Sequence, residues 1–230
     1  MKVGIIGLGL IGGSLGLALK RAYGNGVDIK GFSRSEESRK EALEMGAIDK
    51  VAPISEMGDR DIIIISTPIL VIRDILKEIG EVLRGRIIIT DTGSTKREIM
   101  GWAERYLSGD MVFVGGHPMA GKEKWGIREA RADIFEGSVY CIVPGRGAKE
   151  EDVEFLKGMV ERIGSIPMLM DAQEHDYIVC GISHLPLALS VALILLVREE
   201  EWEKMGMLAS TGFKDTTPVS YTHLTLPTKA

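Results

Sequence analysis

The chain has 230 residues, of which 45% are hydrophobic and 27% are charged, and its formal net charge is -5 at pH 7. This length can bury one full core and begin a second, and the acidic balance argues against a nucleic-acid partner, because nucleic-acid binders usually carry a concentrated basic face. The two cysteines, Cys141 and Cys180, form neither a disulfide framework nor a C-x-x-C metal or redox pair, so a cytoplasmic location is expected.

Short β-rich apolar segments alternate with amphipathic helical patterns over the first 170 residues, which predicts an α/β fold with a mostly parallel sheet. The expected strands are 2–6, 28–32, 61–65, 86–90, 111–114 and 138–143, with a last one near 166–170. Because the run Ile62–Ile65 has no polar alternation, we expect it at the centre of the sheet with helices on both faces.

The pattern becomes helical from residue 172 to residue 207. We therefore expect a Rossmann-type domain over 1–170 and the start of an all-helical domain over 171–218. The apolar run Leu185–Val197 is too short for a membrane span and contains Pro186, so a buried helix and no membrane partner are expected. Residues 219–230 lack helical periodicity and are predicted to be a foreign tail, with a native disordered tail as the alternative.

A glycine motif, Gly7-Leu8-Gly9-Leu10-Ile11-Gly12, follows the first strand and opens a helix over 10–21, which is the context required for dinucleotide binding. Gly7 permits the tight turn, Gly9 lets the backbone approach a pyrophosphate, and Gly12 allows close packing of helix and strand. The first helical residues, Leu10 and Ile11, would offer unpaired N–H groups to phosphate. A glycine-rich turn without a ligand is the alternative.

Cofactor choice is usually determined at the end of the second strand, where an acidic residue would hydrogen-bond a ribose 2′-hydroxyl. Here that position reads Ser33-Arg34. Hydroxyl and guanidinium donors suit a 2′-phosphate, so NADP is favoured over NAD. The alternative is that Arg34 stacks on the adenine, which both cofactors would accept.

Two further polar segments follow strands and are assigned to the cofactor site. They supply Ser66, Thr67 and Pro68 after the strand at 61–65, and Thr92 after the strand at 86–90. Ligands bind at the carboxyl ends of strands in open α/β sheets, which supports the assignment. An ordinary proline-started helix is the alternative for the first segment.

A catalytic pair is expected at the same edge of the sheet. His117 lies in a glycine- and proline-flanked segment, predicted to be a loop, after the strand at 111–114. Its imidazole suits the removal of a hydroxyl proton during hydride transfer, because histidine titrates near neutrality. Ser94 would hydrogen-bond the same hydroxyl. A structural loop histidine is the alternative.

The sequence resembles prephenate and arogenate dehydrogenases over residues 1 to about 217. The resemblance is carried by five motifs in the family's order: GLGLIGGS at 7–14, DTGSTK at 91–96, GGHPMAG at 115–121, His175-Asp176 followed by SHLP at 183–186, and GFKD at 212–215. The segments around His117 and His184 are the specific ones. The glycine motif is common to many dehydrogenases.

This resemblance implies an oxidative decarboxylation of prephenate to 4-hydroxyphenylpyruvate, with hydride passing to the nicotinamide and the ring carboxylate leaving as CO₂. It also implies that His117 accepts the hydroxyl proton, that Ser94 orients that group, and that Glu123, His184 and Lys214 surround the substrate. The family suggests a homodimer. His175 and His184 could be considered as a pair of metal ligands, but their spacing of nine residues on a predicted helix points them to opposite faces, so no metal site is expected. An arogenate dehydrogenase, a hydroxyacid dehydrogenase of the same architecture and a non-catalytic dinucleotide-binding fragment remain alternatives.

Three positions depart from the family pattern. Lys122 stands where a small hydroxyl residue is common, Leu187 where a second histidine is common, and Pro218 where a substrate-binding arginine is expected. The resemblance therefore implies a chain that is cut short within its helical domain. Such a chain is expected to bind its cofactor but to have greatly reduced or no turnover.

Overall fold

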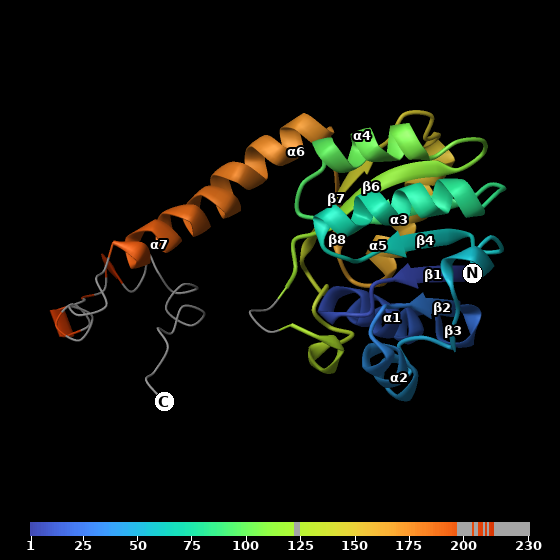
Figure 1. Cartoon of the computed structure of the whole chain (residues 1–230), viewed down its shortest axis with the longest axis horizontal. Coiled ribbons are helices and arrows are strands. Elements are labelled where there is room, and N and C mark those ends of the chain that lie inside the picture. Colours follow the sequence, from blue (N-terminus) through green and yellow to red (C-terminus); the bar gives the residue numbers. More distant parts are fainter. Residues whose placement is uncertain (122–124, 197–203, 205–206, 209, 211, 214–230) are drawn as a thin grey trace. The chain divides into compact units, whose positions relative to one another are not determined.

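A computed structural model describes residues 1–121, 125–196, 204, 207–208, 210 and 212–213. The chain divides into two compact units, a first unit over Met1–Asp176 and a second unit over Tyr177–Ala230. The first unit contains the sheet drawn in Figure 1.

Eight strands form one sheet in the order β3-β2-β1-β4-β5-β6-β7-β8. Their bounds are β1 Lys2–Ile6, β2 Asp28–Phe32, β3 Lys50–Val51, β4 Ile62–Ile65, β5 Ile88–Asp91, β6 Val112–Pro118, β7 Val139–Pro144 and β8 Ile166–Leu169. All neighbours are parallel except β6 and β7, which are antiparallel. The predicted mostly parallel α/β sheet is confirmed, and the chain reverses its direction of winding between β1 and β4.

Helices cover both faces of this sheet (Figure 1). Their bounds are α1 Leu10–Tyr23, α2 Glu36–Glu44, α3 Ile69–Val82, α4 Arg97–Tyr106 and α5 Glu150–Arg162, with short 3-10 turns at Gly24–Gly26, Ile54–Glu56 and Ile127–Glu129. One core packs α1 and α5 against Ile62 and Ile64, and a second packs α3 and α4 against Ile63 and Ile65. All four isoleucines are fully buried, so the central strand with covered faces is confirmed.

The segment around His117 differs from its prediction as a loop. Residues through Pro118 belong to β6, and His117 pairs with Cys141 of β7. Gly116 lets β6 lie close to the end of β5, since a Cβ on Gly116 would lie 2.6 Å from the carbonyl oxygen of Asp91. The prediction of a loop was wrong because the two glycines Gly115 and Gly116 were interpreted as a turn.

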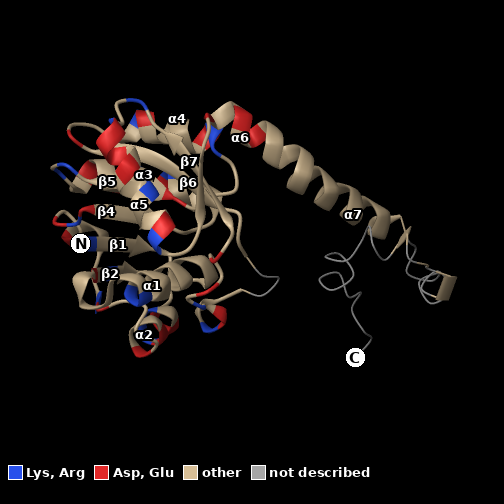
Figure 2. Ribbon diagram, turned by 180° about the vertical axis from the view of Figure 1, so that it is seen from behind, with Lys and Arg blue, Asp and Glu red and all other residues tan. Residues whose placement is uncertain are grey.

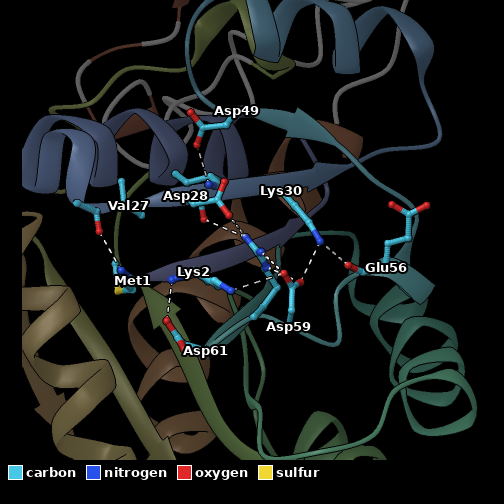
Figure 3. Close-up of polar contacts among 12 residues, drawn as sticks. Met1, Lys2, Val27, Asp28, Lys30, Asp49, Glu56, Asp59 and Asp61 are labelled. Carbon is cyan, nitrogen blue, oxygen red and sulfur yellow. Dashed lines mark hydrogen bonds and ion pairs between the residues drawn. The ribbon is translucent and has the colours of Figure 1, made fainter.

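A cluster of charged groups joins the starts of β1, β2 and β4, as Figure 3 shows. Arg60 is only 3% exposed, and its guanidinium is hydrogen-bonded to the carboxylates of Asp28 and Asp59. Lys30 also donates to Asp59 over 2.9 Å. The backbone N–H of Lys2 donates to a carboxylate oxygen of Asp61 over 2.6 Å. These contacts lie at the amino ends of the strands, so they stabilise the edge opposite the carboxyl ends.

The helical segment begins with α6 (Ala172–Val179), continues through a π-helical turn at Cys180–His184 and ends with α7 (Leu185–Leu195). Figure 2 shows no charged residue on α7. Only Ser190 and Ile194 of α7 are buried, so the prediction of a buried helix is wrong for the single chain. Among the described residues, neither apolar core includes a side chain of α7, so most of its apolar residues have no cover within the chain. By length and composition alone, the helix over Ala172–Leu195 is also long and apolar enough to cross a membrane.

Candidate functional site

A cavity of 420 Å³ opens at the carboxyl ends of β1, β2 and β4. Of the predicted cofactor residues, it is lined by Gly7, Gly9, Ser33, Arg34, Ser66, Thr67 and Pro68. Apolar side chains of Val71 and Ile75 line it as well, together with the carboxylates of Asp74 and Glu78. The cavity lies where the strand order reverses, which is the usual place for a ligand in a doubly wound sheet.

In the turn between β1 and α1, each glycine of the motif has a different structural role. Gly7 has a φ of +101°, and a Cβ there would lie 2.1 Å from the carbonyl oxygen of Ser66. A Cβ on Gly12 would lie 1.9 Å from the carbonyl oxygen of Gly7. A Cβ on Gly9 would meet nothing within 4 Å, so this residue faces open space beside the start of α1. The helix therefore presents its first N–H groups beside an unfilled volume.

Polar groups at the ends of β4 and β5 lie at the same carboxyl edge of the sheet. Thr92 donates to the hydroxyl of Ser66 over 3.2 Å, which joins the ends of β5 and β4. The hydroxyl of Thr67 is buried and has no hydrogen-bond partner among the described residues. An unpaired buried hydroxyl in the wall, together with the open space at Gly9, fits a polar ligand of dinucleotide type. Leu10, Ile11, Gly12 and Thr92 do not line the cavity themselves.

A buried ion pair holds the segment after β5. Asp91 and Lys96 are both fully buried, and their side chains are hydrogen-bonded to each other. Asp91 also accepts from the N–H of Gly93 over 2.8 Å and from that of Gly116 over 3.1 Å. Burial lowers the pKa of Lys96, and the carboxylate of Asp91 opposes that change. The pair thus ties the end of β5 to β6 one residue before His117.

His117 is the first member of a chain of side chains that ends at α4. Its Nδ1 lies 2.9 Å from Nε2 of His175, and the two rings meet edge to face. His175 is fully buried, and its Nδ1 lies 2.8 Å from Oδ1 of Asp176. The carboxylate of Asp176 accepts from the backbone N–H groups of Lys96 and Arg97, over 2.6 and 3.0 Å. All five residues in these contacts belong to the first unit.

The environment of Asp176 keeps it ionised. Partial burial raises the pKa of its carboxyl, but the hydrogen bonds from the N–H of Arg97, from His175 and from the N–H of Lys96 outweigh that effect and hold the pKa below its usual value. A negative charge therefore stays next to His175 at neutral pH.

The other predicted site residues are placed as follows. Ser94 is half-buried between β5 and α4, in the segment that the ion pair holds. His184 ends the π-helical turn of the second unit and is partly buried there. Glu123 and Lys214 lie outside the described residues, as do Lys122, Pro218 and the tail at 219–230.

Two family models match the chain. The nucleotide-binding domain of prephenate dehydrogenase matches residues 15–168, which is more than half of the chain. The chain belongs to the prephenate dehydrogenase family. The dimerization domain of prephenate dehydrogenase matches residues 171–224, so both domains of this family are represented.

Individual members of the prephenate dehydrogenase family agree with this assignment. The prephenate dehydrogenase of Bacillus subtilis (strain 168) is 34% identical over 221 residues, which cover 94% of this chain and 59% of that protein. A prephenate dehydrogenase structure from A. aeolicus, in complex with hydroxyphenyl propionate and NAD+, has a TM-score of 0.84 at 31% identity and covers 96% of this chain and 78% of its own. A Synechocystis arogenate dehydrogenase structure has a TM-score of 0.82 at 34% identity, with 95% and 78% covered. The chain spans about three fifths of the length of the first two curated relatives it matches.

Sequence reasoning missed three residues that the structure brings together at this site. Lys96 stood in a family motif without a role, because nothing in the sequence showed that its ammonium would be buried against Asp91. His175 and Asp176 stood in another motif, and His175 was weighed only as a metal ligand. The available signal was a histidine and a carboxylate at the start of an otherwise apolar helical stretch. Among the described residues, no group of three or more potential ligands gathers as a metal site.

Proposed function

We propose that this protein is an NAD(P)-dependent dehydrogenase that converts prephenate to 4-hydroxyphenylpyruvate by oxidative decarboxylation. The observation that carries the proposal is the place of His117, which lies at the same sheet edge as the cavity and is linked by hydrogen bonds to His175 and Asp176. Family membership gives the substrate class. A histidine held in this way is suited to accept a hydroxyl proton.

Different residues of the chain would bind the cofactor and transfer the proton. The turn at Gly7–Gly12 and the polar wall at Ser66 and Thr67 would hold the dinucleotide. A nicotinamide cofactor, when bound, supplies the hydride acceptor. His117 accepts the hydroxyl proton as hydride leaves the same carbon, and Ser94 orients that hydroxyl. Loss of the proton and the hydride leaves a carbonyl group at that carbon. When the ring carboxylate then leaves as CO₂, its bonding electrons complete the aromatic ring, and the oxygen takes the proton back from His117 to give the phenol.

The experiment compares the wild-type chain with His117→Asn under single-turnover conditions, which also detect a slow reaction. Prephenate is added to cofactor-saturated protein, and reduced nicotinamide is followed by absorbance. We expect reduction by the wild type, loss of about 100-fold or more in the variant and unchanged cofactor affinity. If neither form reduces the cofactor while both bind it, the protein is a non-catalytic dinucleotide-binding module and the proposal is overturned.

Arogenate is the second candidate substrate, because an arogenate dehydrogenase structure is among the similar ones. Both substrates carry the same ring, carbinol and ring carboxylate, so the proton transfer through His117 is the same. They differ at the side chain, near which the family resemblance places Glu123 and Lys214. Comparing kcat/KM for the two substrates decides between them.

We further propose that the cavity prefers NADP to NAD. The support is that Ser33 and the exposed Arg34 line it at the end of β2, where no carboxylate stands. Asp74 and Glu78 of α3 line the same cavity and oppose the preference. The A. aeolicus protein was solved with NAD+, so the question is open to a direct test. Fluorescence titration should show tighter binding of NADPH than of NADH, and Arg34→Ala should abolish the difference; equal or tighter binding of NADH by the wild type would refute it.

We also propose a homodimer formed through the helical segment. The support is the match of residues 171–224 to a dimerization domain, together with the exposed apolar side chains of α7. Neighbouring exposed apolar side chains often mark an interface with another protein molecule.

A further inference from the structure

The hydrogen-bond chain from His117 to Asp176 allows the protonation of each nitrogen to be assigned. Asp176 is ionised, and a carboxylate only accepts hydrogen bonds, so Nδ1 of His175 carries the proton of the 2.8 Å contact. In a neutral imidazole the other nitrogen is then an acceptor. Nε2 of His175 must therefore accept, and Nδ1 of His117 must donate across their 2.9 Å contact.

We propose that His175 and Asp176 are positioning residues that hold His117 in the tautomer protonated at Nδ1, so that its Nε2 keeps the lone pair needed to accept a proton. This inference rests on the proposed function for its catalytic meaning, but the tautomer is a property of the folded chain alone. Neither residue needs to touch the substrate. Their effect reaches the reaction through the orientation and proton distribution of His117.

Two features of the surroundings make this assignment stable. His175 is fully buried, so water does not compete for its two ring nitrogens. Asp176 is held at the start of α4 by two backbone N–H groups, which orient its carboxylate and favour its negative charge. Lys96, which is paired with Asp91, is the charged side chain that the structure couples to this carboxylate: the charge of Asp176 raises the pKa of Lys96 against the lowering by burial.

A purely structural role for Asp176 has to be separated from this one. Its carboxylate bonds the first turn of α4, so Asp176→Asn disturbs both the helix start and the hydrogen bond to His175. His175→Leu removes the acceptor for His117 and leaves the contacts of Asp176 to α4 in place. Asp171→Asn is the matched control, because the carboxylate of Asp171 accepts from the N–H groups of Gln173 and Glu174 at the start of α6. Its backbone carbonyl accepts from the N–H of His175 over 3.0 Å, and the substitution leaves that bond in place.

The experiment is ¹⁵N NMR of the full chain with labelled histidine, recorded near neutral pH on the wild type and these three variants. In the wild type and in Asp171→Asn, we expect Nδ1 of His117 to carry the proton and Nε2 to have the shift of an unprotonated nitrogen. In Asp176→Asn and His175→Leu, we expect the Nε2-protonated tautomer to gain population. A dispersed amide spectrum confirms that each variant is folded.

Two results would overturn the inference: a wild type in which Nε2 of His117 is protonated, or a His175→Leu protein with the wild-type tautomer. The outcome is independent of turnover. If the wild type has the assigned tautomer but does not reduce the cofactor with prephenate, the proposed function fails and the positioning role stands. Where turnover is measurable, kcat of Asp176→Asn should fall by about 100-fold with KM little changed.

Discussion

At the scale of single residues, the buried ion pair of Asp91 and Lys96 has consequences for both stability and the site. Both side chains are fully buried, so each depends on the other for its charge. The carboxylate also accepts two backbone N–H groups, one of them next to His117. The pair therefore contributes to the position of the histidine as well as to stability.

Removing one partner should leave an uncompensated buried charge. We expect Lys96→Met to lower the free energy of unfolding by about 3 to 5 kcal/mol, measured by urea denaturation. The double variant Asp91→Asn with Lys96→Met should lose less, because no charge is then left unpaired. A single variant as stable as the double one would show that the charge of Asp91 is solvated in some other way.

Asp59 makes stability depend on pH. The hydrogen bonds from Arg60, then that from Lys30, lower the pKa of its carboxyl in the folded state. Its contribution is therefore complete above the unfolded pKa of about 3.9 and is lost as pH falls toward the folded value. Between pH 6 and pH 3 we expect the wild type to lose more unfolding free energy than Asp59→Asn. Glu44→Gln, on an exposed helical pair, serves as the control and should lose as much as the wild type.

At the scale of elements, substitutions in the turn between β1 and α1 should affect stability and dinucleotide binding separately. Gly9→Ala places its Cβ in open space, so we expect stability within about 0.5 kcal/mol of wild type but dinucleotide affinity weakened by about tenfold or more. Gly12→Ala forces a Cβ against the carbonyl oxygen of Gly7 and should cost about 2 to 3 kcal/mol of unfolding free energy. Calorimetry and fluorescence titration measure the two effects.

The control for this turn is Gly101→Ala in α4, where a Cβ also meets nothing. This variant should keep its affinity and gain up to about 1 kcal/mol, because alanine favours a helix interior. Unchanged affinity in Gly9→Ala would mean that the ligand does not approach this residue.

The elements themselves were predictable to different degrees. The strands at 2–6 and 28–32 agree with their predictions residue for residue, because each is an apolar run bounded by glycine or polar residues. The short strand β3 was missed, since Lys50 and Val51 alone give no periodicity. The end of β6 was missed because glycine is depleted in strands and typical of turns, so the pair Gly115-Gly116 indicated a loop.

The candidate site was predictable wherever a local motif determines the position of a side chain. Seven predicted cofactor residues line one cavity because the turns after β1, β2 and β4 meet at one edge. The link from His117 to His175 joins residues 58 positions apart and depends on how α6 begins, which no local pattern encodes. The roles of all these residues stay predictions until they are measured.

At the scale of the whole molecule, the exposed apolar side chains of α7 determine the expected assembly. We expect the chain to sediment as a dimer, and Leu189→Glu to shift it toward monomer, because a charge would be buried in the interface. Leu70→Glu, on an exposed side chain of α3, is the matched control and should leave the dimer intact. A wild-type monomer at micromolar concentration, measured by analytical ultracentrifugation, would contradict the proposed homodimer.

The hydrogen bonds that link His117, His175 and Asp176 also determine where this protein can be divided to make chimeras. The nucleotide-binding family model ends at residue 168 and the dimerization model begins at residue 171, close to the predicted boundary at 170. A chimera joined there would transplant the dinucleotide cavity without the two side chains that support its histidine. A junction after Asp176, where the first compact unit ends, keeps His117, His175 and Asp176 in one exchangeable piece. The transferable module is therefore several residues longer than the module that sequence similarity marks out.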